Sequence, residues 1–80
     1  MNICEAVVLR VNDLLAEKKM TLYRLEKNSG ILHGSMACIM NGRNKNVTLK
    51  TIMQISWGFR MELNEFLDPK LFNFKNIDLF

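Results

Sequence analysis

The chain has 80 residues, of which 49% are hydrophobic, and a formal net charge of +3. That length allows one domain with one core, and the scarcity of Gly (four) and Pro (one) argues against disorder and against a fold of many tight turns. The N-terminus lacks a basic stretch followed by an apolar run, and no window reaches about 18 consecutive apolar residues. We therefore expect a cytoplasmic protein without a signal peptide or a membrane span.

Two helices are predicted near the N-terminus. The first covers about residues 2–18, because apolar residues recur there at helical spacing. Thr21 is placed to cap a second helix over about residues 22–28, and Gly30 suits the left-handed residue that follows a helix. The apolar stripe of the first helix consists of Ile3, Val7, Val11, Leu14 and Leu15.

Three further helices are predicted after the turn. The spacing of apolar residues indicates a third helix over about residues 33–41, closed by an Asn-Gly pair. A polar loop then leads to Thr48, which is placed to cap a fourth helix that ends near residue 58. A fifth helix covers about residues 63–67, and Pro69 ends it.

The second and third helices, joined by a short Gly-containing turn, would cross at a steep angle and let the third helix project from the domain. The outward face of that third helix would carry His33, Gly34, Ala37, Cys38 and Asn41. One core is predicted to contain Leu25, Ile31, Met36, Ile39, Leu49, Ile52, Ile55 and Leu63, and Trp57 is most simply explained as a core residue too.

Charge is distributed unevenly along the chain. Residues 27–61 contain five basic residues and no carboxylate, a charge of +5, whereas the segments on either side contain both signs. A surface that only keeps a protein in solution usually mixes the two signs, so this acid-free segment indicates a polyanionic partner. Its basic residues are Lys27, Arg43, Lys45, Lys50 and Arg60.

Three segments, MTLYRLEKNSGI, IMNGRNKNVTLKTI and MELNEFLD, follow one another with matching loops. In them the chain resembles the Cro and lambda-repressor-like helix-turn-helix regulators, often called the XRE family, over residues 3–67. The resemblance implies an all-α, five-helix DNA-binding domain over residues 1–68 and a short apolar C-terminal extension over residues 69–80. It also implies a sequence-specific transcriptional regulator whose third helix enters the major groove of double-stranded DNA, without a cofactor or a small-molecule ligand.

The resemblance further implies two sets of DNA contacts. Contacts with base edges or the groove would come from Leu32, His33, Gly34, Ala37, Cys38 and Asn41. Contacts with phosphates would come from Thr21, Leu22, Tyr23, Asn44, Lys45, Thr48 and Lys50. The N-terminus of the fourth helix supports the second set independently, because free amides and the positive end of the helix dipole favour a phosphate there.

Several positions depart from the family's usual residues, among them Leu15 and Met40, which replace an Arg–Glu pair that many members have. Leu22 stands where Gln commonly contacts a phosphate. Glu26 stands where Ala lets two helices approach closely, so either its stem bends outward or the crossing is looser. Leu32 replaces the Ser or Thr that caps the third helix, at a cost of about 1 kcal/mol. Arg60 replaces the Gly that ends the fourth helix, where a left-handed backbone costs roughly 1 kcal/mol.

An enzyme is not expected, because no nucleophile or paired carboxylate is arranged around His33, the only histidine. His33 is either a DNA contact or an exposed residue without a role. Cys4 and Cys38 are expected to be reduced thiols, and a metal site built from them and His33 has the wrong spacing and only three ligands. Cys38 itself faces the groove, is an incidental surface thiol or acts as a redox sensor.

The outward face of the third helix offers few hydrogen-bonding side chains, so an alternative function stays open. It is a protein-interaction module of the antirepressor or antitoxin type on the same fold. We also expect a homodimer, because one such helix covers only a few base pairs. Its interface is predicted in the fifth helix and in residues 71–80, which hold six large apolar residues. The other explanation for these residues is that the tail folds back onto its own chain.

Overall fold

A computed structural model of the chain describes residues 1–43 and 46–80. Within these residues the predicted all-α fold is confirmed, with no strand, and each helix begins and ends within about two residues of its expected bounds. No helix in the described part is long and apolar enough to cross a membrane. The helices are α1 (Ile3–Glu17), α2 (Leu22–Ser29), α3 (His33–Met40), α4 (Leu49–Gly58) and α5 (Leu63–Phe66).

Side chains cap the N-termini of α1, α2 and α4. The Asn2 side chain accepts from the Glu5 N–H at 2.8 Å, and the Glu5 carboxylate accepts from the Asn2 N–H at 2.8 Å, which forms a capping box. Thr21 accepts from the Arg24 N–H at the start of α2, and Thr48 caps α4 in the same way. Both predicted threonine caps are therefore confirmed, and they fix where α2 and α4 begin.

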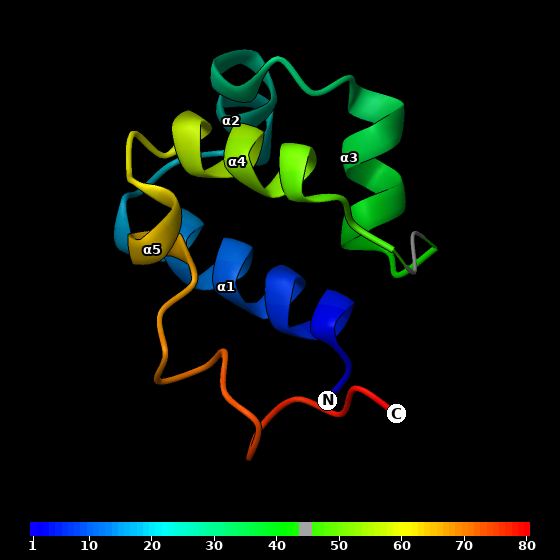
Figure 1. The fold of residues 1–80 in the computed structure, drawn as a ribbon. Coiled ribbons are helices and arrows are strands. Elements are labelled where there is room, and N and C mark those ends of the chain that lie inside the picture. Colours follow the sequence, from blue (N-terminus) through cyan, green and yellow to red (C-terminus); the bar gives the residue numbers. More distant parts are fainter. Residues whose placement is uncertain (44–45) are drawn as a thin grey trace.

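All five helices contribute to the core, and α4 crosses the front of the molecule in Figure 1 with α3 at one end and α5 at the other. Two predictions about burial are wrong, because Leu49 and Trp57 are exposed on α4. Helical periodicity fixes the spacing of a face but not how far the neighbouring helices extend over it. The buried cluster is Val7, Val11, Leu14, Leu25, Ile31, Met36, Ile52, Ile55, Phe59 and Phe66, with Leu63 packed against it and Ile39 also buried.

α2 and α4 approach each other closely at Gly58. A Cβ atom there would lie 2.7 Å from Leu25 Cδ1 and 3.3 Å from the Leu25 carbonyl oxygen, so only glycine fits without a shift. The Asn28 amide donates to the Gly58 carbonyl at 3.2 Å, and the Gln54 amide donates to the Ser29 carbonyl at 3.4 Å. These contacts fix α2, and through the turn at Gly30 they position α3.

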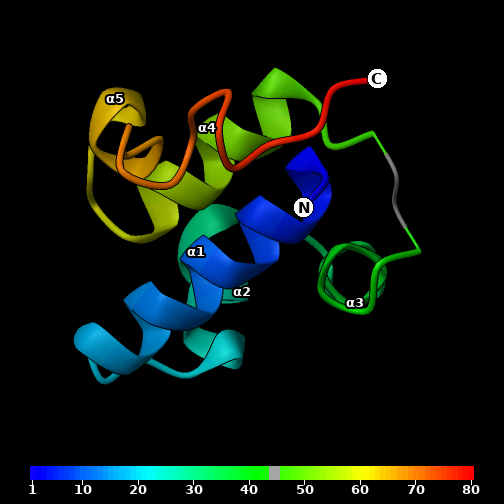
Figure 2. The same cartoon turned by 90° about the horizontal axis from the view of Figure 1, so that it is seen from below.

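The C-terminal tail folds back onto its own chain. Phe72 packs beside Phe66, with ring centroids 6.2 Å apart, and Ile77 is buried. The Asp78 N–H donates to the Met1 carbonyl at 2.8 Å, and the Met1 ammonium lies 3.1 Å from the Asp78 carboxylate. The tail therefore runs back to the N-terminus of α1, as Figures 1 and 2 show. Other tail residues, among them Phe74, Leu79 and Phe80, remain open to solvent.

Candidate nucleic-acid interface

The candidate base-contacting residues lie on one outward face of α3. His33, Gly34 and Asn41 are exposed, and Ala37 and Cys38 are half-buried beside them. The opposite side of the helix carries Met36 and Ile39, which are buried and hold α3 against the domain. Figure 2 shows α3 projecting beside α1 and α2 rather than lying under them. The outer surface of α3 is thus made mostly of small side chains, so its backbone can come close to a flat or grooved partner.

The N-terminal end of α3 is fastened to α2 by a side-chain pair. His33 Nδ1 lies 3.0 and 3.1 Å from the two carboxylate oxygens of Glu26. A carboxylate can only accept, so the imidazole donates from Nδ1. Glu26 has 9% of its side chain exposed and His33 has 83%. Glu26 therefore points inward under α3, which rules out the outward-bent stem, one of the two alternatives that the sequence left open.

This pair stands where a conventional cap is missing. Leu32 occupies the N-cap position of α3 and makes no side-chain cap hydrogen bond, as predicted from its apolar side chain. A helix without that cap is less firmly held at its first turn. The Glu26–His33 pair ties the same turn to α2 instead, which fixes the start of α3 by a contact between helices.

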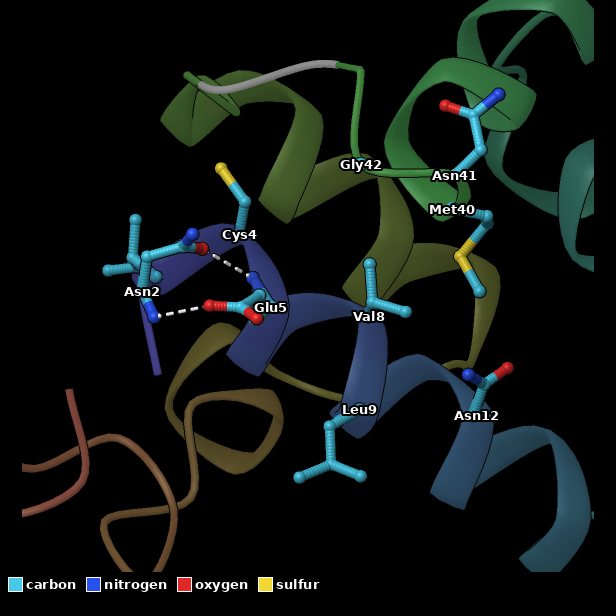
Figure 3. Close-up of a pocket in the computed structure, with 10 residues that line it drawn as sticks. Asn2, Cys4, Glu5, Val8, Leu9, Asn12, Met40, Asn41 and Gly42 are labelled. Carbon is cyan, nitrogen blue, oxygen red and sulfur yellow. Dashed lines mark hydrogen bonds between the residues drawn. The ribbon is translucent and has the colours of Figure 1, made fainter. Parts of the chain in front are cut away.

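At the other end of α3, the Asn41 amide is oriented by the loop that follows. Its Oδ1 accepts from the Arg43 N–H at 3.1 Å, which leaves the amide N–H₂ group and one oxygen lone pair available. Figure 3 shows this amide pointing away from an open groove of about 730 Å³ between α1 and α3, while Met40 extends toward α1. Asn41 is therefore presented outward rather than used to join the two helices.

Sequence reasoning did not name Arg43 among the contact residues. Arg43 is exposed and lines a shallow hollow on the outward side of α3 together with Gly34, Ser35 and Cys38. The signal was present in the sequence, because Arg43 belongs to the acid-free segment and directly follows Asn41-Gly42. It adds a cation to a face that otherwise carries few polar groups.

The candidate phosphate contacts lie at the starts of α2 and α4. Thr21, Tyr23, Thr48 and Lys50 are exposed, whereas the Leu22 side chain packs against the core and leaves only its backbone N–H for a phosphate. The Lys27 ammonium lies over the Tyr23 ring, with its Nζ 5.2 Å from the ring centroid, in a cation–π contact. The two other predicted contacts, Asn44 and Lys45, lie outside the described residues.

Neither cysteine forms a disulfide, and Cys4 is buried whereas Cys38 is half-buried on α3. Among the residues that the structure describes, no three His, Cys, Asp or Glu side chains come together in a way that could hold a metal ion. The chemistry available on this side of the molecule is therefore hydrogen bonding, positive charge and close approach of backbone.

Two short helices joined by a glycine turn, with the second one presented outward, define a helix-turn-helix DNA-binding domain. Residues 10–70 match the model of the Cro/C1-type helix-turn-helix DNA-binding domain, and the chain belongs to that family. The resemblance drawn from the sequence is confirmed, and the protein is a DNA-binding regulator of a typically non-enzymatic family. Neither the curated proteins nor the solved structures contain a significant match to the chain.

Proposed function

We propose that the chain is a sequence-specific transcriptional regulator that places α3 in the major groove of double-stranded DNA. The observation that carries this proposal is the outward face of α3, where Gly34, Ala37 and Cys38 stand between two polar ends, His33 and Asn41. Side chains this small let a helix lie deep in a groove. The protein acts in the cytoplasm, without a cofactor and as a homodimer on paired half-sites.

Base recognition falls mainly to Asn41. A carboxamide can contact adenine with both its N–H₂ group and its oxygen, and the Arg43 N–H already orients the side chain for such a contact. His33 presents its second ring nitrogen outward, since Nδ1 faces Glu26. Leu32 and Ala37 offer apolar contact with a thymine methyl group. Because these direct contacts are few, DNA shape contributes a large part of the specificity.

Two helix N-termini hold the phosphate backbone on either side of α3. The first turn of α2, with Thr21 and the free N–H of Leu22, provides one anion site, and Tyr23 lies beside it. The first turn of α4 provides the other, with Thr48 and the Lys50 ammonium. Asn44, Lys45 and Arg43 belong to the segment between α3 and α4 and extend this second site.

Replacement of Lys50 tests the proposal by measuring its phosphate contact. Lys50→Ala should weaken binding to duplex DNA regardless of sequence and flatten the slope of log affinity against log salt by about one unit. Asn41→Ala should instead change which sequence is preferred, by about 1–3 kcal/mol of discrimination. Fluorescence anisotropy over a salt series measures the first effect, and binding to a randomised duplex library measures the second.

Lys75→Ala is the matched control, because Lys75 is an exposed lysine of the tail, outside every proposed contact. Equal affinities of the Lys50→Ala and Lys75→Ala variants at moderate salt would show that the proposed docking is wrong. If the wild-type chain binds no duplex even at low salt, the alternative interaction module gains support. Exposed Leu32, at the start of α3, would then be the first residue to test against a protein partner.

A further inference from the structure

The buried Glu26 carboxylate depends on a single hydrogen-bond donor. His33 Nδ1 lies 3.1 Å from Oε1 and 3.0 Å from Oε2, and among the described residues no other group donates to these two oxygens. The Glu26 side chain is 9% exposed, whereas the His33 side chain is 83% exposed. A buried carboxylate is costly without a hydrogen bond, because water cannot replace the missing donor. Glu26 therefore keeps a proton on Nδ1 of the ring.

This contact decides what the other ring nitrogen of His33 can do. A neutral imidazole has one N–H group and one nitrogen lone pair. Because the proton of the neutral ring stays on Nδ1, against Glu26, Nε2 carries the lone pair and can only accept. Nε2 becomes a donor only when the ring takes up a second proton and is a positively charged imidazolium. Without Glu26, a neutral ring could instead carry its proton on Nε2 and donate from there.

The position of the ring decides what Nε2 meets. His33 is the first residue of α3, and its bond to Glu26 holds the ring at the junction with α2. In a helix-turn-helix the first of the two helices crosses the phosphate backbone of the duplex. An exposed ring at this junction thus faces the backbone, whose phosphate oxygens accept hydrogen bonds. A neutral His33 would turn a lone pair toward them, whereas an imidazolium would donate to them.

Few other charged groups lie around this ring. Within 4 Å, Glu26 is the one charged group that pairs with His33 among the described residues, and α3 carries no other charged side chain. Lys27 on α2 lies over an aromatic ring of its own helix, and Glu5 on α1 belongs to a capping box. Arg43 lines the hollow that begins at the residue after His33. The ring therefore has a carboxylate on its inner side and is open to a ligand on its outer side.

We propose that His33 contacts a DNA phosphate only as an imidazolium, and that Glu26 is the positioning residue that imposes this by holding the ring proton on Nδ1. DNA binding then takes up one proton, which enters at Nε2 of the neutral ring. The imidazolium lies between two anions, the Glu26 carboxylate at Nδ1 and the phosphate at Nε2. The phosphate contact rests on the proposed DNA-binding function, whereas the role of Glu26 in the free chain does not.

Proton uptake makes the affinity for DNA depend on pH. The complex holds one proton more than the separate molecules, so a fall in pH favours the complex and a rise in pH weakens it. Imidazole side chains ordinarily change charge between about pH 5 and 8, so the effect falls in that range. The phosphate contact of His33 is lost at the upper end of the range, whereas the contact proposed for Lys50 is kept.

Nuclear magnetic resonance of the free chain tests the role of Glu26 without DNA. His33 is the only histidine, so the ¹⁵N signals of an imidazole ring belong to it alone. At about pH 8, where the ring is neutral, the wild-type chain should carry the proton on Nδ1 and leave Nε2 bare. Glu26→Gln, whose amide can donate as well as accept, should show both tautomers. A wild-type ring with its proton on Nε2 would overturn the positioning role.

Fluorescence anisotropy with a labelled duplex tests proton uptake between about pH 5.5 and 8. The affinity of the wild-type chain should fall by up to about tenfold for each pH unit. The slope of log affinity against log salt should also be steeper by about one unit at the acid end, because one more phosphate is neutralised there. His33→Gln is the matched control, since its amide donates at every pH and never becomes charged. Thermal unfolding over the same range confirms that each variant is folded.

Each comparison supports or overturns one part of the inference. A pH dependence that His33→Gln shares with the wild-type chain would refute proton uptake at His33. A pH dependence confined to one preferred duplex would place His33 on a base edge instead of a phosphate. Glu26→Gln should flatten the pH dependence, because its neutral ring can donate from Nε2, and an unchanged profile would remove Glu26 from the contact. If the wild-type chain binds no duplex at any pH, the proposed function and the phosphate contact both fail, and the spectra of the free chain decide the role of Glu26.

Discussion

The outward faces of α3 and α4 differ in kind although the two helices are neighbours. On α3 the exposed side chains are small, with Gly34 and Ala37 at its centre, and the polar groups stand at the two ends. On α4 they are large and apolar, as Met53 and Trp57 show. Small side chains bring a helix backbone close to the floor of a groove, whereas large apolar ones gain free energy only when another protein surface excludes water from them. Exposure by itself therefore does not identify a binding surface, but the size of the exposed side chains indicates its partner.

Both faces depend on the contact between α2 and α4. α3 is carried by α2, and α2 meets α4 at Gly58 without room for a side chain. If α2 and α4 no longer met closely at Gly58, α2 would tilt and carry α3 with it. The set of α4 side chains exposed to solvent would change as well. The two surfaces are consequently separate in chemistry but joined in structure, and substitutions can be chosen that damage both, one or neither.

The largest effect is expected from Gly58→Val, which should damage both. The new side chain would meet Leu25 at less than van der Waals distance, so the free energy of unfolding should fall by about 1–3 kcal/mol. Thermal unfolding would show a midpoint lowered by roughly 4–8 °C for each kcal/mol. Gly34→Ala is the control, because a Cβ there meets nothing within 4 Å. Gly34→Ala should raise the free energy of unfolding by about 0.5–1 kcal/mol. A Gly58→Val variant as stable as the wild-type chain would refute the close approach of α2 and α4.

An intermediate effect is expected at the start of α3. His33→Ala leaves the buried Glu26 carboxylate without its imidazole partner, which should lower the free energy of unfolding by about 1 kcal/mol, since water still reaches this edge. Adding Glu26→Ala should restore most of that loss, because a buried pair is often replaced without cost. Urea unfolding of the wild-type chain, the two single variants and the double variant completes a double-mutant cycle. Additive losses would mean that the two side chains do not interact.

The smallest effect is expected from Trp57→Ala, measured at a protein concentration where the chain is monomeric. The Trp57 side chain is mostly exposed and its ring contact is with Arg60, so the free energy of unfolding should change by no more than about 0.5 kcal/mol. A tryptophan in the core would lose about 3–5 kcal/mol on the same replacement. Urea unfolding monitored by circular dichroism distinguishes the two values, and a loss near the larger one would place Trp57 in the core after all.

Local chemistry explains which features could be predicted from the sequence. The caps at Thr21 and Thr48, the left-handed Gly30 and the left-handed Arg60, with φ of 56°, depend on a few consecutive residues. The strain at Arg60 was also expected, and its contact with the Trp57 ring and carbonyl offsets part of it. Structural features that span only a few consecutive residues follow from residue type and order, because neighbours along the chain are their main environment.

Predictions that depended on distant parts of the chain were less successful. Trp57 and Leu49 lie on a helix whose apolar residues spread over more than half of its circumference, so periodicity could not decide which part of that face the core would cover. Glu26 stood out as a departure from the family, yet nothing in the sequence said that its carboxylate would turn inward and meet His33. The side of α3 that faces solvent could be predicted, because Met36 and Ile39 at helical spacing mark the opposite, buried side.

The sequence by itself determined the helices, their ends, the helix-turn-helix and the residues that α3 turns outward, because capping, glycine conformation and helical spacing act over one or two turns. The tertiary structure alone decided that α2 and α4 meet closely at Gly58, that Ile77 is buried as the tail returns, and that Leu49, Met53 and Trp57 of α4 are left uncovered. Burial of an apolar residue depends on which elements reach it, and five short helices leave too little surface to cover every apolar face of the described chain.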